Sequence, residues 1–298
     1  MRKMRTIRKC DPMTFQISPQ TQVAHVTLRV RNLGTMTDFY TKMVGLIILQ
    51  QTSKMAVLTI PGDERPRLTL KQGYDTIRNL HTTGLYHTAW VQPTRRDLAN
   101  TLQHYQQNHV PVFLAADHRF SQSLYVWDPE MNAVEVYYDL PRASWLILPD
   151  GRMPQRTIPL DTNDLLHEAN NQWQGLASGS RLGHIHLRVS MLRPSTDFYQ
   201  RVLGFGLKDW LVPHASFLAA DGYHHHIALN DWHGPYPKIA SNQTGLMDFT
   251  IDVGAHSSWL ALKQQLTKQQ WLFDQTDGRI QLFDPDQNRL NFVYYDAG

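Results

Sequence analysis

The sequence of 298 residues contains a single cysteine, Cys10, and shows little charge imbalance. One cysteine excludes a disulfide within the chain and any zinc site built on several thiolates. The formal net charge is only +3, whereas nucleic-acid binding usually needs a clustered basic face, so no nucleic-acid partner is expected. Apolar runs long enough to cross a membrane, about 18 residues or more, are also missing, so no membrane partner is expected.

The N-terminal segment is basic but lacks the pattern of a secretory signal. Its first residues, MRKMRTIRKC, are not followed by the apolar stretch of about seven or more residues that a signal peptide needs. We therefore expect residues 1–22 to form a tail. A lone cysteine is typical of a reducing compartment, and we expect a cytoplasmic protein.

Histidine is plentiful where cysteine is scarce, with 15 residues in the chain. A metal in this protein would therefore depend on imidazole and carboxylate ligands. The apolar share of 42% is sufficient for a packed core. The length suggests about two domains of roughly 150 residues each.

The chain contains an internal duplication. The segment VAHVTLRVRNL, which starts at Val23 and is followed by TDFY, reappears from Leu182 as LGHIHLRVSML, again followed by TDFY. A second matching pair consists of DPEMNAVEVYY from Asp128 and DPDQNRLNFVY from Asp284. The sequence therefore consists of two copies of a unit of about 150 residues.

Each unit is itself predicted to contain two βαβββ modules. In the first unit, residues 25–30 alternate like a strand and residues 37–45 have helical spacing, with Gly45 as the helix C-cap. The same plan restarts with a strand at 85–91 and a helix at 95–108. We predict an α+β fold of four modules in two paired-module domains, each an open barrel-like mixed sheet.

The domain boundaries follow from composition. Proline- and glycine-rich turns lie between the two units and indicate a linker. We predict a tail at 1–22, an N-terminal two-module domain at 23–145, a linker at 146–180 and a C-terminal two-module domain at 181–298.

The first unit carries a candidate metal-binding set. His25 and His87 lie on the first strands of its two modules, and Glu135 lies within an apolar strand, AVEVY. A carboxylate buried there needs a positive partner. Two histidines and one carboxylate with open positions suit non-haem Fe(II), while Mn(II) and Zn(II) are also chemically compatible.

The second unit offers a weaker set. His184 matches His25, Asp248 matches His87, and a neutral amide, Asn291, replaces Glu135. A competing histidine cluster lies nearby, and strand alternation places two of its members on one face and His225 on the other. A second metal or substrate site could consist of His184, His186, His224, His226 and Asp248. The simpler interpretation, which we favour, is that these rings line a polar interior or an interface.

The duplicated modules resemble the vicinal oxygen chelate superfamily, which includes glyoxalases, bleomycin-resistance proteins and type I extradiol dioxygenases. The stretch HRFSQSLYVWDPEMNAVE from His118 is similar to the extradiol signature, although Met131 replaces the expected glycine. Further matches are GLYH, DLPR and GYHHH. The sequence looks most like the catechol-2,3-dioxygenase-like (CatE-type) subgroup.

This resemblance implies roles for individual residues. His25, His87 and Glu135 would bind the metal, His118 would be the acid/base group, and Tyr125 would donate a hydrogen bond to the substrate. The well-known extradiol enzymes carry the metal in the C-terminal domain, so the N-terminal set here departs from the pattern. The implied function is metal-dependent ring cleavage of a catechol-like vicinal diol by O2, with Fe(II) as the favoured metal.

Three alternatives remain at this stage. One is glyoxalase-like lyase or isomerase chemistry on the same scaffold, because a fold alone does not fix the reaction. Another is a small-molecule-sequestering resistance protein without catalysis. The third is a structural or partner-binding role at a homo-oligomer interface, with which eight tryptophans and twelve tyrosines are compatible.

Overall fold

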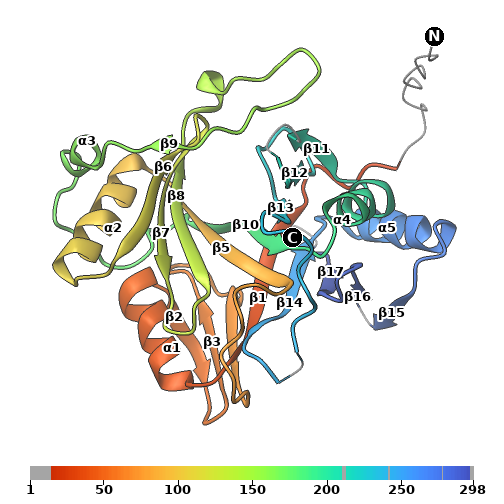
Figure 1. The fold of residues 1–298 in the computed structure, drawn as a ribbon, viewed down its shortest axis with the longest axis horizontal. Coiled ribbons are helices and arrows are strands. Elements are labelled where there is room, and N and C mark those ends of the chain that lie inside the picture. The colour runs from red at the N-terminus through yellow and green to blue at the C-terminus, as the bar shows by residue number, and fades with distance from the viewer. Residues whose placement is uncertain (1–14, 210–212, 241, 277, 296–298) are drawn as a thin grey trace.

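The computed structural model describes residues 15–209, 213–240, 242–276 and 278–295 (Figure 1). Cys10 and most of the predicted tail lie outside the described residues. The described chain has an α+β fold of four βαβββ modules, as predicted.

The two modules of the first half follow one another directly. The first consists of β1 (Gln22–Val30), α1 (Leu33–Phe39) with its π-helical extension η1 (Tyr40–Val44), β2 (Ile47–Gln51), β3 (Met55–Thr59) and β4 (Leu68–Gln72). The second consists of β5 (Gly84–Gln92), α2 (Arg95–Gln107), β6 (Val112–Asp117), β7 (Ser121–Trp127) and β8 (Ala133–Asp139).

The second half repeats this order after the linker. The linker contains η2 (Arg142–Ser144), β9 (Ile158–Pro159) and α3 (Thr162–Leu166). The third module consists of β10 (Arg181–Arg188), α4 (Leu192–Asp197) with η3 (Phe198–Val202), β11 (Gly206–Asp209), β12 (Ala215–Ala219) and β13 (Ile227–Asn230). The fourth consists of β14 (Gly245–Asp252), α5 (His256–Lys268), β15 (Phe273–Thr276), β16 (Arg279–Phe283) and β17 (Arg289–Val293).

Strand pairing crosses the two halves of the chain. Among the described residues, one sheet has nine strands in the order β11-β12-β13-β10-β5-β8-β7-β6-β9, which joins the third module to the second; we term it the pocket sheet. The other has eight strands in the order β15-β16-β17-β14-β1-β4-β3-β2, which joins the fourth module to the first; we term it the twin sheet. The sheets therefore do not coincide with the predicted domains at 23–145 and 181–298.

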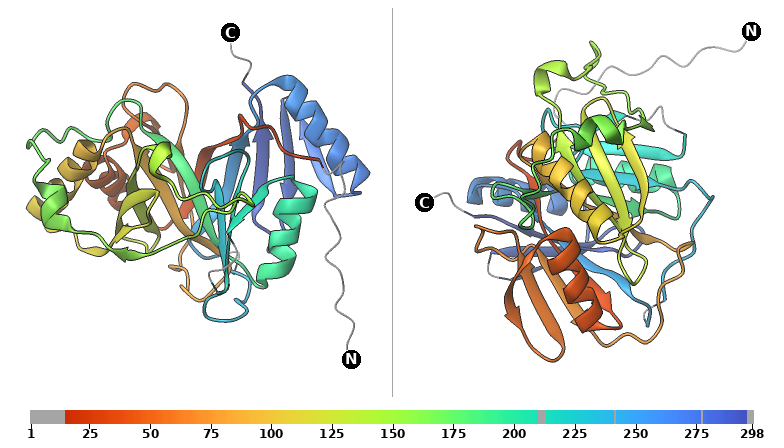
Figure 2. Two further views of the ribbon diagram at one scale, coloured as in Figure 1. Left: turned by 90° about the horizontal axis from the view of Figure 1, so that it is seen from above. Right: turned by 90° about the vertical axis from the view of Figure 1, so that its left-hand side faces the viewer.

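The helices, in contrast, do follow the halves. Figures 1 and 2 show α1 and α2 at one end of the molecule and α4 and α5 at the other, while both sheets run between these ends. Each first strand pairs with its counterpart from the other half in antiparallel fashion, β1 with β14 and β10 with β5. One continuous apolar core connects all four modules.

Alternation along the strands separates this core from two polar sheet faces. In β1, Val26, Leu28 and Val30 are fully buried in the core. His25 and Thr27 therefore point to the opposite face of the twin sheet, because successive side chains of a strand alternate. The same pattern in β10 turns His184 and His186 to the polar face of the pocket sheet.

The two repeated sequence motifs interlock the modules of each half. In the first half, the hydroxyl of Tyr40 donates to Oδ2 of Asp128 at 3.0 Å, and in the second that of Tyr199 donates to Oδ2 of Asp284 at 3.0 Å. Burial raises the pKa of both carboxyls to about 6 despite these hydrogen bonds. Gly45 ends the π-helical turn with a φ of 93°, as predicted for a helix C-cap. No helix among the described residues is long and apolar enough to cross a membrane.

Candidate metal centre and pocket

A cavity of about 490 Å³ opens on the polar face of the pocket sheet. Its floor carries histidines and carboxylate from three adjacent strands, β10, β5 and β8. Its walls are largely aromatic and apolar, and include Tyr86, Leu114, Phe120, Phe217 and Trp232. A cavity with apolar walls and a few converging polar groups is typical of a small-molecule site.

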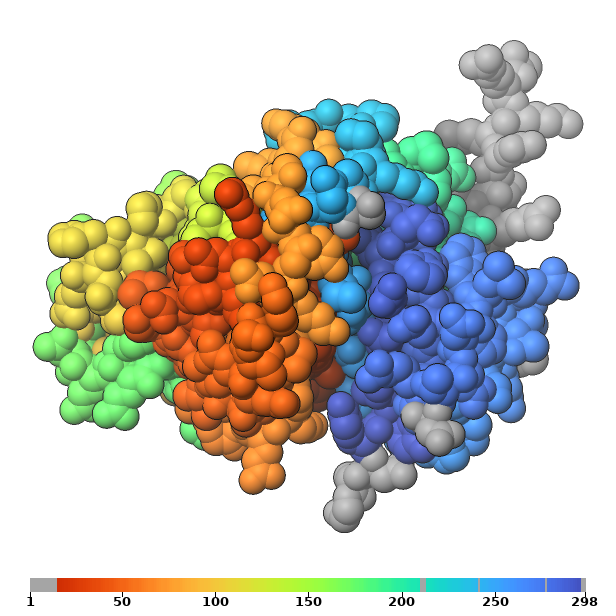
Figure 3. Space-filling model, turned by 90° about the horizontal axis from the view of Figure 1, so that it is seen from below, coloured from red at the N-terminus to blue at the C-terminus, as the bar shows by residue number. Residues whose placement is uncertain are grey.

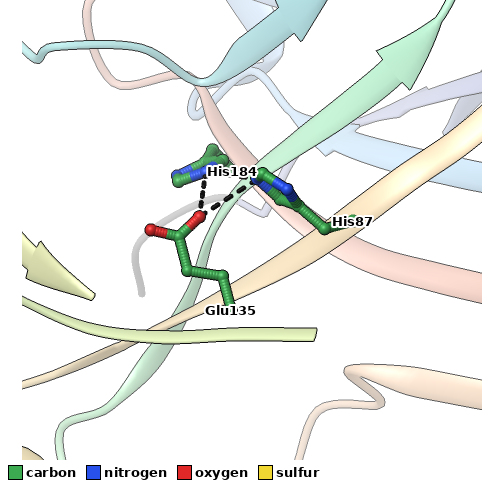
Figure 4. Close-up of side chains that lie close together, drawn as sticks. All are labelled: His87, Glu135 and His184. Atoms are coloured by element: carbon green, nitrogen blue, oxygen red, sulfur yellow. Dashed lines mark hydrogen bonds and ion pairs between the residues drawn. The ribbon is translucent and has the colours of Figure 1, made fainter. Parts of the chain in front are cut away.

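Three donor atoms converge on this floor (Figure 4). His87 lies on β5, Glu135 on β8 and His184 on β10. Oε2 of Glu135 lies 3.0 Å from Nε2 of each histidine, and the two Nε2 atoms lie 3.2 Å apart. All three side chains are buried. The cluster is thus two imidazoles and one carboxylate held by three neighbouring strands.

The register of these strands explains the convergence. Ala89 of β5 pairs with His184 of β10 on one side and with Glu135 of β8 on the other. His87, two residues before Ala89, points to the same face. A strand period of two thus brings three side chains, distant in sequence, into one triangle.

The electrostatics of the triangle favour a neutral His184 and an ionised Glu135. Burial lowers the pKa of His184 to about 4, which outweighs the opposing effect of Glu135. Burial alone would raise the pKa of Glu135, but His184 and His87 hold it well below its usual range. A buried carboxylate needs a cation nearby, and a neutral imidazole is a metal ligand rather than a cation.

Packing, more than hydrogen bonding, orients the two rings. Among the described residues, Nδ1 of His87 and Nδ1 of His184 have no hydrogen-bond partner. The ring of His87 contacts Tyr86 and Tyr125, with centroids 5.1 and 5.5 Å away, and that of His184 packs on His225 at 4.1 Å. Both Nε2 atoms are thereby left facing Glu135.

This donor set fits a divalent metal ion. Neighbouring ligands about 2.1 Å from one octahedral ion would lie about 3 Å apart, which matches the observed separations. Two histidines and one carboxylate leave open positions, the arrangement that suits non-haem Fe(II). The pocket lies directly against the triangle, so those positions would face a bound small molecule.

The two residues predicted to act on the substrate both line this pocket. Nε2 of His118 lies 3.0 Å from the hydroxyl of Tyr125, and Nδ1 of His118 lies 2.7 Å from the carbonyl oxygen of Arg156. A hydrogen bond to that carbonyl requires a proton on Nδ1, so Nε2 of the neutral ring accepts from Tyr125. Burial lowers the pKa of His118 and raises that of Tyr125, so both groups are neutral near pH 7.

The prediction that His25 is a metal ligand needs correction, because His25 lies on the twin sheet and not in the pocket. Its Nε2 lies 2.8 Å from the hydroxyl of Thr69 on β4. His184 occupies the corresponding position beside His87 and Glu135. The reason is the pairing of β5 with β10 instead of β1, which brings in the first strand of the third module.

The predicted second site is also not found as one group. His184 belongs to the triangle, and His186 lines the same pocket, 3.0 Å from the amide nitrogen of Asn230. Asp248 lies on the twin sheet, where it accepts from Thr27 at 3.0 Å. The remaining members lie just before β13 and outside the pocket lining: His224 and His226.

His225 also lines the pocket, whereas strand alternation in the sequence indicates only that it faces away from its two neighbours. Its Nδ1 lies 2.8 Å from Nδ1 of His224, whose Nε2 lies 3.0 Å from Oδ1 of Asp139. Nε2 of His224 donates to the ionised Asp139, so its Nδ1 accepts from Nδ1 of His225, whose pKa burial holds well below its usual range. This series of hydrogen bonds from Asp139 through His224 leaves Nε2 of His225 as an acceptor at the pocket. Strand alternation within GYHHH is the sequence feature that distinguishes His225, since it places this side chain on the opposite face from both neighbours.

Comparison with known proteins agrees with the fold. The sequence profile of the Glyoxalase/Bleomycin resistance protein/Dioxygenase superfamily matches residues 22–136 and 181–292. A catechol-2,3-dioxygenase of Bacillus subtilis is 32% identical over 275 residues, which cover 90% of this chain and 95% of the relative. A biphenyl-2,3-diol 1,2-dioxygenase of Rhodococcus globerulus is 30% identical over 121 residues, 40% of this chain and 63% of the relative.

Solved structures show the same fold at low sequence identity. A solved structure from Bacillus subtilis that is described as a dioxygenase aligns with a TM-score of 0.65 and 14% identity. The alignment covers 95% of this chain and 87% of that one. Glyoxalase I from Zea mays aligns with a TM-score of 0.55 and 16% identity, over 92% of each chain. The named sequence relatives support an extradiol dioxygenase-like enzyme. The chain therefore belongs to the glyoxalase, bleomycin resistance protein and dioxygenase superfamily, also known as the vicinal oxygen chelate superfamily.

Proposed function

We propose that this protein is an Fe(II)-dependent extradiol dioxygenase that cleaves the ring of a catechol-like diol with O2. The observation that carries this proposal is the triangle of His87, Glu135 and His184 on the floor of the pocket. Likeness to the Bacillus catechol-2,3-dioxygenase supports it. Mn(II) is compatible with the same donors, and a metal assay distinguishes the two ions.

The three ligands would bind the metal through Nε2 of His87, Nε2 of His184 and the carboxylate of Glu135. When bound, the ion would supply Lewis acidity and a common point of attachment for the two vicinal oxygens and O2. The apolar and aromatic walls would hold the ring and exclude water, which strengthens the hydrogen bonds within the site. Holding both reactants in one cavity also lowers the entropic barrier to their reaction.

Three further side chains would orient the substrate and accept its protons. The hydroxyl of Tyr125, which donates to His118 in the structure, would donate to a substrate oxygen instead. Nε2 of His225 would accept a proton from a substrate hydroxyl, because the hydrogen bonds from Asp139 through His224 leave this atom without a hydrogen. His118 accepts from Tyr125 at 3.0 Å in the structure, and once Tyr125 donates to the substrate, Nε2 of His118 would be free to act as the acid/base group.

The test combines metal analysis with oxygen uptake. The protein is purified anaerobically, its iron, manganese and zinc are measured, and oxygen consumption is followed with a panel of catechols. We expect bound iron and a yellow ring-cleavage product. Glu135→Gln should abolish metal binding and turnover, whereas Asn291→Ala, at the matching position of the twin sheet, should leave both unchanged. A protein that binds no divalent metal, or turns over no catechol when loaded with iron, contradicts the proposal.

A further inference from the structure

The twin sheet has a polar face of its own, built on the same register as the pocket sheet. His25 of β1 pairs with Thr250 of β14, and Thr250 pairs with Asn291 of β17. This row corresponds to His184, Ala89 and Glu135 in the pocket sheet. The twin face therefore retains the shape of the metal centre but replaces its carboxylate with an amide.

This face is accessible from outside. Figure 3 shows a furrow between the first module, in orange, and the fourth, in blue, with lighter blue atoms of β14 inside it. His25, Lys71, Asp248 and Arg289 are all partly exposed. We term this polar face of the twin sheet the twin groove, and its residues include His25, Lys71, Asp248, Thr250, Arg279, Arg289 and Asn291.

Three cations of the twin groove have no counterpart in the pocket. By strand register, Lys71, Arg279 and Arg289 occupy the positions that Asn230, Ser123 and Ala133 hold in the pocket sheet. Other basic residues of this face have partners: Arg67 is paired with Asp63, and Arg29 donates to the carbonyl of Leu246. None of the ion pairs found between described residues involves Lys71, Arg279 or Arg289.

All three cations lie close enough to Asp248 to affect its ionisation. Burial raises the pKa of Asp248, while Arg289, Lys71 and Arg279 each oppose that rise. Asp248 is engaged with its own neighbours, since it accepts from Thr27 at 3.0 Å and from the amide of Asn291 at 3.3 Å. Nε of Arg289 is buried without a hydrogen-bond partner in the described structure. Two carboxylates of this face, Asp248 and Asp252, against three cations leave the groove electropositive.

We propose that the twin groove binds a small organic anion, with a carboxylate or phosphate group held by Lys71, Arg279 and Arg289. Guanidinium groups suit both anions because their paired N–H donors match two oxygens. Asn291 and Thr250 would add hydrogen bonds at the floor, and Phe283, which lies 5.7 Å from the guanidinium of Arg289, would contact an apolar part of the ligand. The metal position of one sheet has thus become an anion position in the other.

Isothermal titration of the purified, metal-loaded protein under anaerobic conditions tests this proposal. Inorganic phosphate and benzoate serve as the two probes, each titrated to tens of millimolar. We expect saturable binding at one site, weakened at least about tenfold by Lys71→Gln and by Arg289→Gln. Lys42→Gln provides the matched control, because Lys42 is an exposed lysine of the same module that pairs with Asp38. A thermal melt of each variant confirms that it is folded.

The two probes also identify the source of the anion. Tighter binding of phosphate indicates a phosphate ester as the ligand, and tighter binding of benzoate indicates an aromatic carboxylate. Absence of saturable binding by either probe overturns the proposal. So does binding that is lost in Glu135→Gln but kept in Lys71→Gln, since the anion would then lie in the pocket. The proposal does not depend on ring cleavage, and its failure leaves the proposed activity untouched.

Discussion

The two sheets of this protein show what a duplicated scaffold retains and what it changes. Each sheet joins one module from either half, and each places a histidine of its first strand, His184 or His25, at the same position. The pocket sheet adds His87 and Glu135 beside that histidine, whereas the twin sheet adds Asp248 and Asn291. Equal backbones thus carry unequal chemistry, and the difference lies in a few side chains on one face.

The contrast extends to how each histidine is held. His184 contacts a carboxylate and a second imidazole, while His25 contacts only the hydroxyl of Thr69 among the polar side chains described around it. Burial lowers the pKa of each ring to about 4. Burial and a shifted pKa are therefore shared by both positions. The neighbouring Glu135 and His87 distinguish the candidate metal centre around His184 from the isolated buried ring of His25.

The largest expected effect comes from replacing each of these two histidines in turn by alanine. His184→Ala should lower metal affinity more than about 100-fold and abolish oxygen uptake, because even outer partners of metal ligands contribute about 10–100-fold. His25→Ala should leave both quantities within about twofold of the wild type. Metal content and catechol-dependent oxygen consumption measure the two effects. Equal losses in the two variants would contradict the assignment of the metal to the pocket sheet.

A second difference concerns His225, whose position in the first half is occupied by Pro66. We expect His225→Asn to lower turnover about 100-fold while metal content stays constant, since a positioned acid–base group contributes about 10²–10⁴-fold. His226→Asn is the matched control, because His226 lies one residue on and outside the pocket lining. Turnover that survives in His225→Asn would remove this residue from the proposed chemistry.

The sequence predicts the modules well because strand alternation and the duplication are local patterns. The second-module helix was expected at 95–108 and is found as Arg95–Gln107. His87, Glu135, His118 and Tyr125 all reach one pocket. Their spacing within a single module carried that information, since neighbouring strands of one module pair predictably.

The pairing between modules could not be read in the same way. The strands HVTLRV and HIHLRV, which begin at His25 and His184, are nearly identical, so either could have been the neighbour of β5. The choice depends on how whole modules pack against one another, which the sequence of a single strand does not encode. The predicted metal set consequently included His25, whereas the structure places His184, at the same register of the third module, beside His87 and Glu135.

A smaller effect concerns stability and pH on the twin sheet. His25 has a pKa of about 4 in the folded protein against an ordinary value of 6.5, so the unfolded chain binds more protons between these values. Stability from this residue is therefore complete above about pH 6.5 and is lost as the pH falls toward 4. His25→Gln should flatten this acid loss by up to about 3 kcal/mol.

Urea unfolding at pH 7 and pH 4.5 measures the change, with His233→Gln on the surface as control. The acid loss of His25→Gln is compared with that of the wild type, so that the pH dependence of every other group, His184 included, is common to both proteins. An acid loss of the same size in His25→Gln and in the wild type would show that His25 is not held neutral by burial.

The smallest expected effect tests what the two halves share. Tyr40→Phe and Tyr199→Phe each remove one hydroxyl that donates to a buried aspartate at 3.0 Å. Each change should lower the free energy of unfolding by about 1–3 kcal/mol, because the carboxylate loses a donor it cannot replace with water. The two losses should be equal within about 0.5 kcal/mol and additive in the double variant, since separate sites rarely couple. Urea unfolding of the three variants measures this. Unequal losses would show that the halves have diverged in their packing as well as on their sheet faces.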